Sequence, residues 1–154
     1  MYSGPYKGAR VTPDLGEPFD DWIDRIYAPE NRGPDNRVAD PRVVYRAVSP
    51  EEAAHAEAAG VFSDPAGAGV YVAPDPERYV GGGAYGGRGR GAIYELDVEG
   101  LSPLTRAGGA GIQEIAYAEI PTDRVRRVWE WDDAAAAHLL TRDLPEDPSF
   151  CPDP

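Results

Sequence analysis

The stretch Val43-Val44-Tyr45-Arg46-Ala47-Val48 decides how the rest of this chain is interpreted. Its β-branched and aromatic residues predict a short strand, in which successive side chains alternate between two faces. Arg46 then shares a face with Val44 and Val48. Because arginine is seldom fully buried without a partner, we expect Arg46 in a polar cleft beside an anion or, more simply, in water or in a structural ion pair.

Composition restricts the classes of protein to which this chain can belong. Its 154 residues fit a single domain with its own core. The 18 glycines and 16 prolines indicate many turns and long loops. A formal net charge of -12 disfavours non-specific binding to a phosphate backbone. Cys151 is the only cysteine, which leaves no intrachain disulfide and no cysteine-based zinc site.

The first part of the chain predicts an arm and two helices. Residues 1–18 are rich in Gly and Pro and predict a flexible N-terminal arm. In segment 19–27 apolar residues recur at helical spacing, which predicts a short amphipathic helix. A second helix is expected to begin after Ser49, with Glu52 completing a capping box, and to end at Gly60.

The second part predicts mainly strands, at 61–62, 70–73, 92–98, 112–118 and 125–131. The other expected elements are a short helix at 77–80, loops at 81–91 and 101–111, and a last helix at 134–141. Because the late strands follow one another without helices between them, we expect an α+β fold with a large antiparallel component. The chain then divides into the arm, a domain at 19–142 and an acidic, Pro-rich tail at 143–154.

Three features, taken in their order along the sequence, suggest an enzymatic function. Arg46 closes the first strand. The strand Gly69-Val70-Tyr71-Val72 is followed by Pro76-Glu77, and Glu114 stands near the start of a late strand after a Gly-rich loop. This order resembles the Arg–Ser–Glu class of ADP-ribosyltransferases, and in particular the small domains of bacterial polymorphic toxins. The resemblance covers roughly residues 42–131 and implies a split antiparallel sheet core with short helices.

The resemblance implies that NAD is the substrate and that no metal takes part. It assigns the NAD diphosphate to Arg46 and catalysis to Glu114. Because aromatic faces suit flat and cationic rings, Tyr71 and Tyr85 are candidates to stack on the rings of NAD, with Tyr79 as an alternative. Gln113 is a candidate for positioning the acceptor. These residue types suit the chemistry, because a carboxylate stabilises an oxocarbenium-like transition state through the sugar 2-hydroxyl and a guanidinium binds phosphate oxygens in pairs.

Two departures from the family pattern leave alternatives open. Ala73-Pro74-Asp75 replaces the Ser-Thr-Ser motif, and Ile112 stands where the family has Gln or Glu. Without that orienting group the domain is alternatively an NAD glycohydrolase. A third hypothesis, favoured by the acidic charge, is a non-catalytic binding or immunity module for a basic partner.

Expected partners and location follow from the same resemblance. A transferase of this kind would modify a protein, or alternatively a nucleic acid or small molecule, and a cognate immunity or antitoxin protein would restrain it. The sequence has no apolar run that spans a bilayer and no signal-peptide pattern. We therefore expect no membrane partner and a cytoplasmic location, or secretion within a larger toxin that acts in a target cell's cytoplasm.

Overall fold

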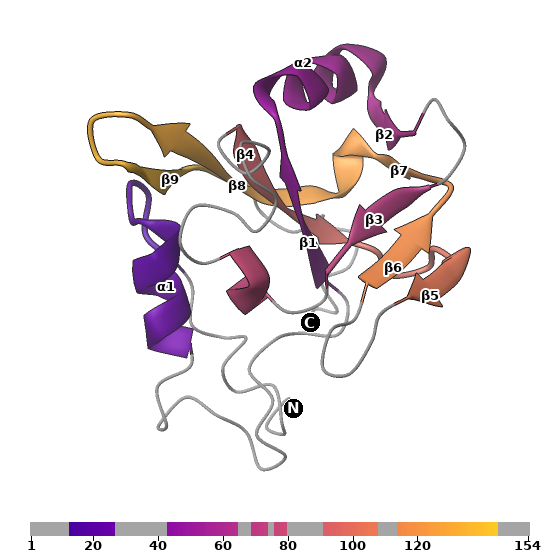
Figure 1. The fold of residues 1–154 in the computed structure, drawn as a ribbon, viewed down its shortest axis with the longest axis horizontal. Helices are drawn as coiled ribbons and strands as arrows, with labels where there is room; N and C mark the ends of the chain where they lie inside the picture. Colours follow the sequence, from indigo (N-terminus) through magenta and orange to yellow (C-terminus); the bar gives the residue numbers. More distant parts are fainter. Residues whose placement is uncertain are drawn as a thin grey trace, which may run out of the picture.

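The chain has an α+β fold in the computed structural model, which describes residues 13–26, 43–64, 69–73, 76–79, 91–107 and 114–144. The α-helices in the described residues are α1 (Phe19–Ile26) and α2 (Pro50–Ala59). They lie on different sides of the sheets, with α1 beside β9 and α2 beside β1 and β2 (Figure 1). The α+β class expected from the order of the strands is thus confirmed.

All strand pairs described are antiparallel, and the largest sheet has four strands in the order β1-β4-β8-β9. These strands are β1 (Val43–Val48), β4 (Ala92–Asp97), β8 (Val125–Asp132) and β9 (Ala137–Asp143). A second sheet has the order β3-β6-β5, formed by β3 (Val70–Val72), β6 (Glu114–Tyr117) and β5 (Thr105–Ala107). The strand β2 (Val61–Ser63) pairs with β7 (Glu119–Pro121), and the 3-10 turns are η3 (Pro76–Tyr79) and η5 (Thr122–Arg124).

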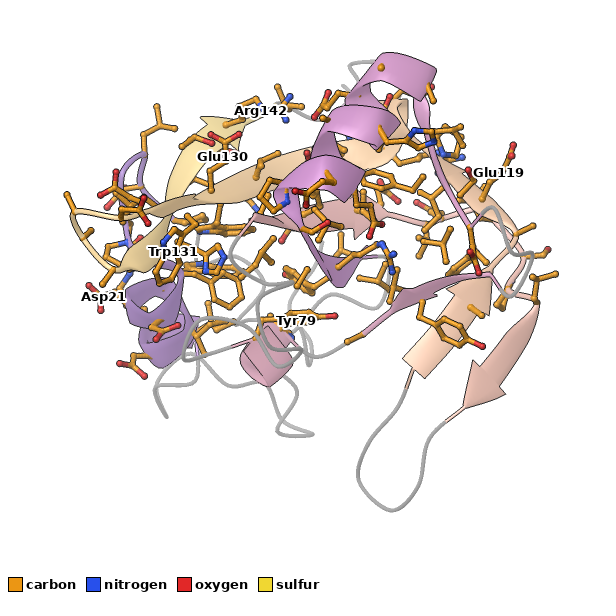
Figure 2. The ribbon with its side chains drawn as sticks, turned by 45° about the horizontal axis from the view of Figure 1, so that its top comes forward. Asp21, Tyr79, Glu119, Glu130, Trp131 and Arg142 are labelled. Atoms are coloured by element: carbon orange, nitrogen blue, oxygen red, sulfur yellow. The ribbon has the colours of Figure 1, made fainter. Side chains whose placement is uncertain are left out.

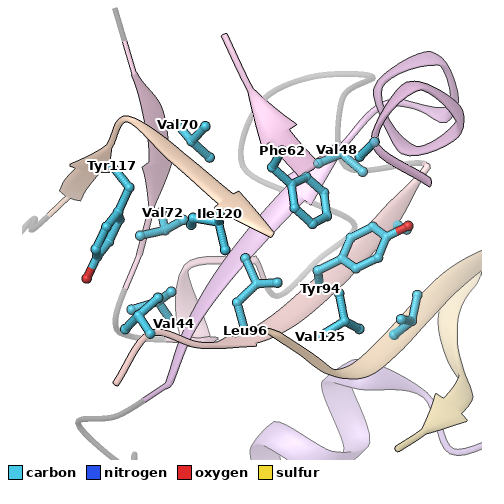
Figure 3. Close-up of a cluster of buried hydrophobic side chains, with 14 of the residues drawn as sticks. Val44, Val48, Phe62, Val70, Val72, Tyr94, Leu96, Tyr117, Ile120 and Val125 are labelled. Carbon is cyan, nitrogen blue, oxygen red and sulfur yellow. The ribbon is translucent and has the colours of Figure 1, made fainter. Parts of the chain in front are cut away.

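The main core lies between one face of the four-stranded sheet and the two smaller sheets. Alternation in β1 directs Val44 and Val48 into this core, as the sequence pattern predicted. Figure 3 shows them with side chains from β2, β3, β4, β6, β7 and β8, namely Phe62, Val70, Val72, Tyr94, Leu96, Tyr117, Ile120 and Val125. Burying this apolar surface holds the sheets together.

The opposite face of the same sheet forms a second core with α1. Tyr45 and Ala47 of β1 face this side, together with Trp129 of β8. The α1 residues that pack here have the predicted helical spacing: Phe19, Trp22, Ile23 and Ile26. Trp22 stacks on Trp129 at a centroid distance of 5.0 Å. Both faces of the sheet are therefore covered, and Tyr79 of η3, labelled in Figure 2, completes the second core.

The predicted boundaries of α2 are confirmed. Ser49 has an extended backbone, and its Oγ accepts the Glu52 N–H at 3.1 Å. Gly60 ends the helix with φ 78°, a left-handed conformation that glycine adopts without steric cost. The Glu52 carboxylate, expected to complete the capping box, binds Arg46 instead.

The prediction of a last helix at 134–141 is wrong, because this segment turns and forms β9. Ala135 N–H donates to Asp132 Oδ2 at 2.8 Å, and Ala136 has φ 52°. Such a tight turn returns the chain along β8, so that His138 and Leu140 alternate into the interior. Alanine favours helices in isolation, but strand pairing with β8 overrides that preference.

Three other expectations differ from the structure. Segment 101–111, expected to be a loop, contains β5, and residues 119–121, for which nothing was expected, form β7. Residues 16–18, expected in the flexible arm, are hydrogen-bonded to β9: Gly16 N–H donates to the Leu140 carbonyl at 2.8 Å. Such short segments become strands because distant segments pair with them, and the local sequence does not show which segments those are.

Candidate functional site

Arg46 lies at the boundary between the main core and a surface pocket. Its Nε and Nη2 are 2.7 Å and 2.5 Å from Oε2 of Glu52, and its Nη1 donates to the Tyr71 carbonyl at 2.6 Å. The Arg46 side chain is 14% exposed and that of Glu52 27%. The half-buried guanidinium thus has the ion pair that its place among valines requires.

The pocket beside Arg46 has a volume of about 470 Å³. It lies between the start of α2, the end of β2 and the start of β3, and its lining residues are Arg46, Glu51, Glu52, His55, Ser63, Asp64, Gly69 and Tyr71. Tyr71 is 38% exposed and lines the pocket, so the residue is accessible to a ligand. Among the described residues, one guanidinium and three carboxylates line the pocket, so that acidic side chains outnumber basic ones in this part of its lining.

The strands that carry Arg46, Tyr71 and Glu114 are neighbours. Tyr45 of β1 forms an isolated bridge with Ala73, directly after β3, and the two residues exchange backbone hydrogen bonds of 2.8 and 2.9 Å. β3 in turn pairs with β6, which begins at Glu114. β3 therefore lies between the strand of Arg46 and the strand that begins at Glu114.

The remaining predicted residues have less structural support. The backbone of Glu114 pairs with Ala107 of β5, but its side chain lies outside the described part of the chain. Gln113 and Tyr85 lie outside the described residues altogether. Arg46 and Tyr71 are therefore the two predicted site residues that the structure brings together with their side chains described.

Glu52 is a pocket residue that sequence reasoning assigned only to helix capping. Its position in the sequence could have indicated contact with Arg46, because Glu52 follows Arg46 by only six residues and the strand passes directly into the helix at Ser49. The fold then directs both side chains to the same side. Glu51 and Asp64 were not considered as site residues, since their meeting depends on the packing of α2 against β2.

A row of polar side chains crosses the opposite face of β1. Tyr45, Glu95, Arg127 and Asp143 are paired in register across the four strands. The Tyr45 hydroxyl donates to Glu95 at 2.7 Å, while Arg127 donates to Glu95 at 2.8 Å and to Asp143 at 3.0 Å. Burial raises the pKa of the Glu95 carboxyl, against the lowering effects of Arg127 and of the Tyr45 hydroxyl. The row ties the four strands together and holds β1, and hence Arg46, in place.

Comparison with family models, with curated proteins and with solved structures gave no match. Within the described residues no group of three His, Cys, Asp or Glu side chains is arranged to hold a metal ion. None of the described helices is long and apolar enough to cross a membrane.

Proposed function

We propose that the chain is an NAD-dependent ADP-ribosyltransferase of the toxin or effector type. The observation that carries the proposal is the adjacency of β1, β3 and β6, since each of these strands bears one of the residues assigned to NAD chemistry. An antiparallel α+β fold with a pocket at Arg46 supports the same assignment.

Arg46 would bind the diphosphate of NAD at the pocket wall. A guanidinium has five N–H donors, and the contacts with Glu52 and Tyr71 engage Nε, Nη1 and Nη2, so that hydrogen atoms on Nη1 and Nη2 remain for phosphate oxygens. The exposed ring of Tyr71, two residues before the bridge at Ala73, would stack on a ring of NAD. The fixed carbonyl of Tyr71 keeps the guanidinium oriented along the pocket.

Glu114 would act on the nicotinamide ribose. In the reaction, the bond between the ribose carbon C1 and the nicotinamide nitrogen breaks, and nicotinamide leaves with the electron pair. The Glu114 carboxylate would accept a hydrogen bond from the ribose 2-hydroxyl and stabilise the positive charge that develops on the sugar. A nucleophile of the acceptor then bonds to C1 and gives up its proton to solvent.

The proposal is tested by measuring NAD loss and nicotinamide release with purified protein and with added cell lysate as a source of acceptors. We expect E114Q to lower the rate at least about a hundredfold, because several kcal/mol of transition-state stabilisation are removed. The matched control is E119Q, which removes an exposed carboxylate on β7 that is labelled in Figure 2. Absence of NAD loss with the wild-type protein in both assays would refute the proposal.

The same assay separates transfer from hydrolysis. Radiolabelled ADP-ribose fixed to a macromolecule indicates a transferase, whereas free ADP-ribose as the sole product indicates an NAD glycohydrolase. The second outcome is the one that Ile112, in place of an orienting Gln or Glu, would favour.

A non-catalytic binding module is the second candidate, and the excess of carboxylates in the Arg46 pocket favours it. The chain's net charge of -12 acts in the same direction, because it attracts basic partners. This function predicts no NAD loss and salt-sensitive binding of polylysine that weakens when Glu51 and Asp64 are both replaced by their amides.

A further inference from the structure

We infer that Glu52 competes with the ligand's diphosphate for Arg46 and thereby sets the affinity of the pocket for anions. The inference rests on the proposed function for the identity of the ligand. It adds a specificity-determining residue that acts against binding. An internal carboxylate holds the Nε–Nη2 edge of the guanidinium and leaves one hydrogen atom on each of Nη1 and Nη2 for a phosphate, until an external anion displaces the carboxylate.

The contacts of Arg46 show what a diphosphate would meet. Glu52 Oε2 lies within hydrogen-bond distance of both Nε and Nη2, which is the edge of the guanidinium best suited to an incoming phosphate. Of the described side chains that line the pocket, Arg46 is the one Lys or Arg, whereas Glu51 and Asp64 add further carboxylates. A diphosphate therefore gains one guanidinium and is repelled by carboxylates as long as Glu52 stays in place.

The structure allows Glu52 to move while Arg46 stays. The backbone N–H of Glu52 is held by Ser49 Oγ, so the first turn of α2 remains formed when the carboxylate swings away. The Glu52 side chain is 27% exposed, so its carboxylate can turn toward solvent. Arg46 keeps its second anchor, the 2.6 Å hydrogen bond from Nη1 to the Tyr71 carbonyl. Glu52 is consequently not required to orient the guanidinium.

The experiment is a calorimetric titration with ADP, a nucleoside diphosphate that needs no catalysis to be detected. E52Q retains the size of the side chain and a hydrogen-bond acceptor but removes its charge. We expect E52Q to bind ADP about tenfold more tightly than the wild type at low salt, and the gain to shrink as ionic strength rises. R46A in the E52Q background should abolish the gain.

The control is E51Q, which makes the same change on the neighbouring residue of α2 and leaves the ion pair with Arg46 intact. We expect its effect on ADP affinity to be smaller than that of E52Q. If Glu52 merely positions Arg46, E52Q will bind ADP as weakly as the wild type or more weakly, which overturns the inference. An equal gain from E51Q, or no ADP binding by any variant, overturns it as well.

The proposed function and the proposed role of Glu52 can be refuted independently of each other. If E52Q tightens ADP binding as expected but the wild type consumes no NAD, the competition stands and the transferase function is refuted. If NAD is consumed in a Glu114-dependent manner while E52Q gains no affinity for ADP, the function stands and the role of Glu52 is refuted.

Discussion

His138 is expected to make the folded state sensitive to mild acid. It lies on β9, 3% exposed, with its ring 5.1 Å from that of Trp131, which is labelled in Figure 2. Burial lowers the pKa of His138 from 6.5 to about 4. The imidazole is therefore neutral in the folded protein over a range of pH in which the unfolded chain binds a proton.

The sign and size of the effect follow from this difference in pKa. The folded pKa lies below the unfolded one, so the stabilising contribution is fully present above pH 6.5 and is lost as the pH falls through the interval down to about 4. Linkage gives a loss of about 2 kcal/mol between roughly pH 7 and pH 5, and about 3 kcal/mol by roughly pH 4. Such a loss is a substantial fraction of the 5 to 15 kcal/mol, roughly, that stabilises an ordinary domain.

The assay is urea unfolding followed by circular dichroism, at a series of pH values, for the wild type and H138Q. H138Q should lose about 2 kcal/mol less than the wild type on acidification from roughly pH 7 to pH 5, whatever its stability at neutral pH. The hydrogen bond from Arg142 lowers the pKa of Glu57 and adds its own loss in acid, but this loss is common to both proteins and cancels. H55Q, which changes the exposed histidine of α2, is the matched control. If the unfolding free energies of the wild type and H138Q change with pH in parallel, the reasoning is refuted.

Three further substitutions test how the fold holds the site. S49A removes the hydroxyl that caps α2 and should cost about 1 kcal/mol in thermal unfolding; an unchanged melting temperature would contradict the cap. G91A places a Cβ against the Val48 carbonyl oxygen, inside van der Waals contact, and a loss of about 3 kcal/mol in urea unfolding is expected; an alanine tolerated without loss would show that the backbones at Gly91 and Val48 do not approach this closely. R127M leaves the buried Glu95 carboxylate without its cation and should cost about 3 to 5 kcal/mol at neutral pH. Because burial raises the pKa of Glu95, part of that loss should return in acid as the carboxyl binds a proton, and a deficit that grows in acid would argue against the pairing.

Local patterns were enough to predict the elements whose stability is local. The capping of α2 by Ser49 and its end at Gly60 involve residues within a turn of each other, so the sequence carries both signals. Alternation in β1 likewise predicted which of its side chains face which core. Arg46 was identified as a residue in need of an anionic partner for the same reason.

Pairing between distant segments decided the rest. The Ala-rich segment before His138 favours a helix by itself, but it becomes a turn and a strand because β8 offers hydrogen bonds and buried positions for His138 and Leu140. β5 and β7 are three residues each and carry no periodicity from which a strand can be predicted.

In the candidate site, too, some features follow from local sequence and others from the packing of distant segments. The sequence by itself determined that Arg46 would lie at the edge of an apolar strand face, because alternation is a property of the strand alone. The tertiary structure decided that its counter-ion is Glu52, that carboxylates dominate the surrounding pocket, and that the strands of Arg46 and Glu114 flank β3. These contacts join separate elements of the fold. They depend on how the apolar surfaces of all the elements are buried together, which the residues of any one segment do not determine.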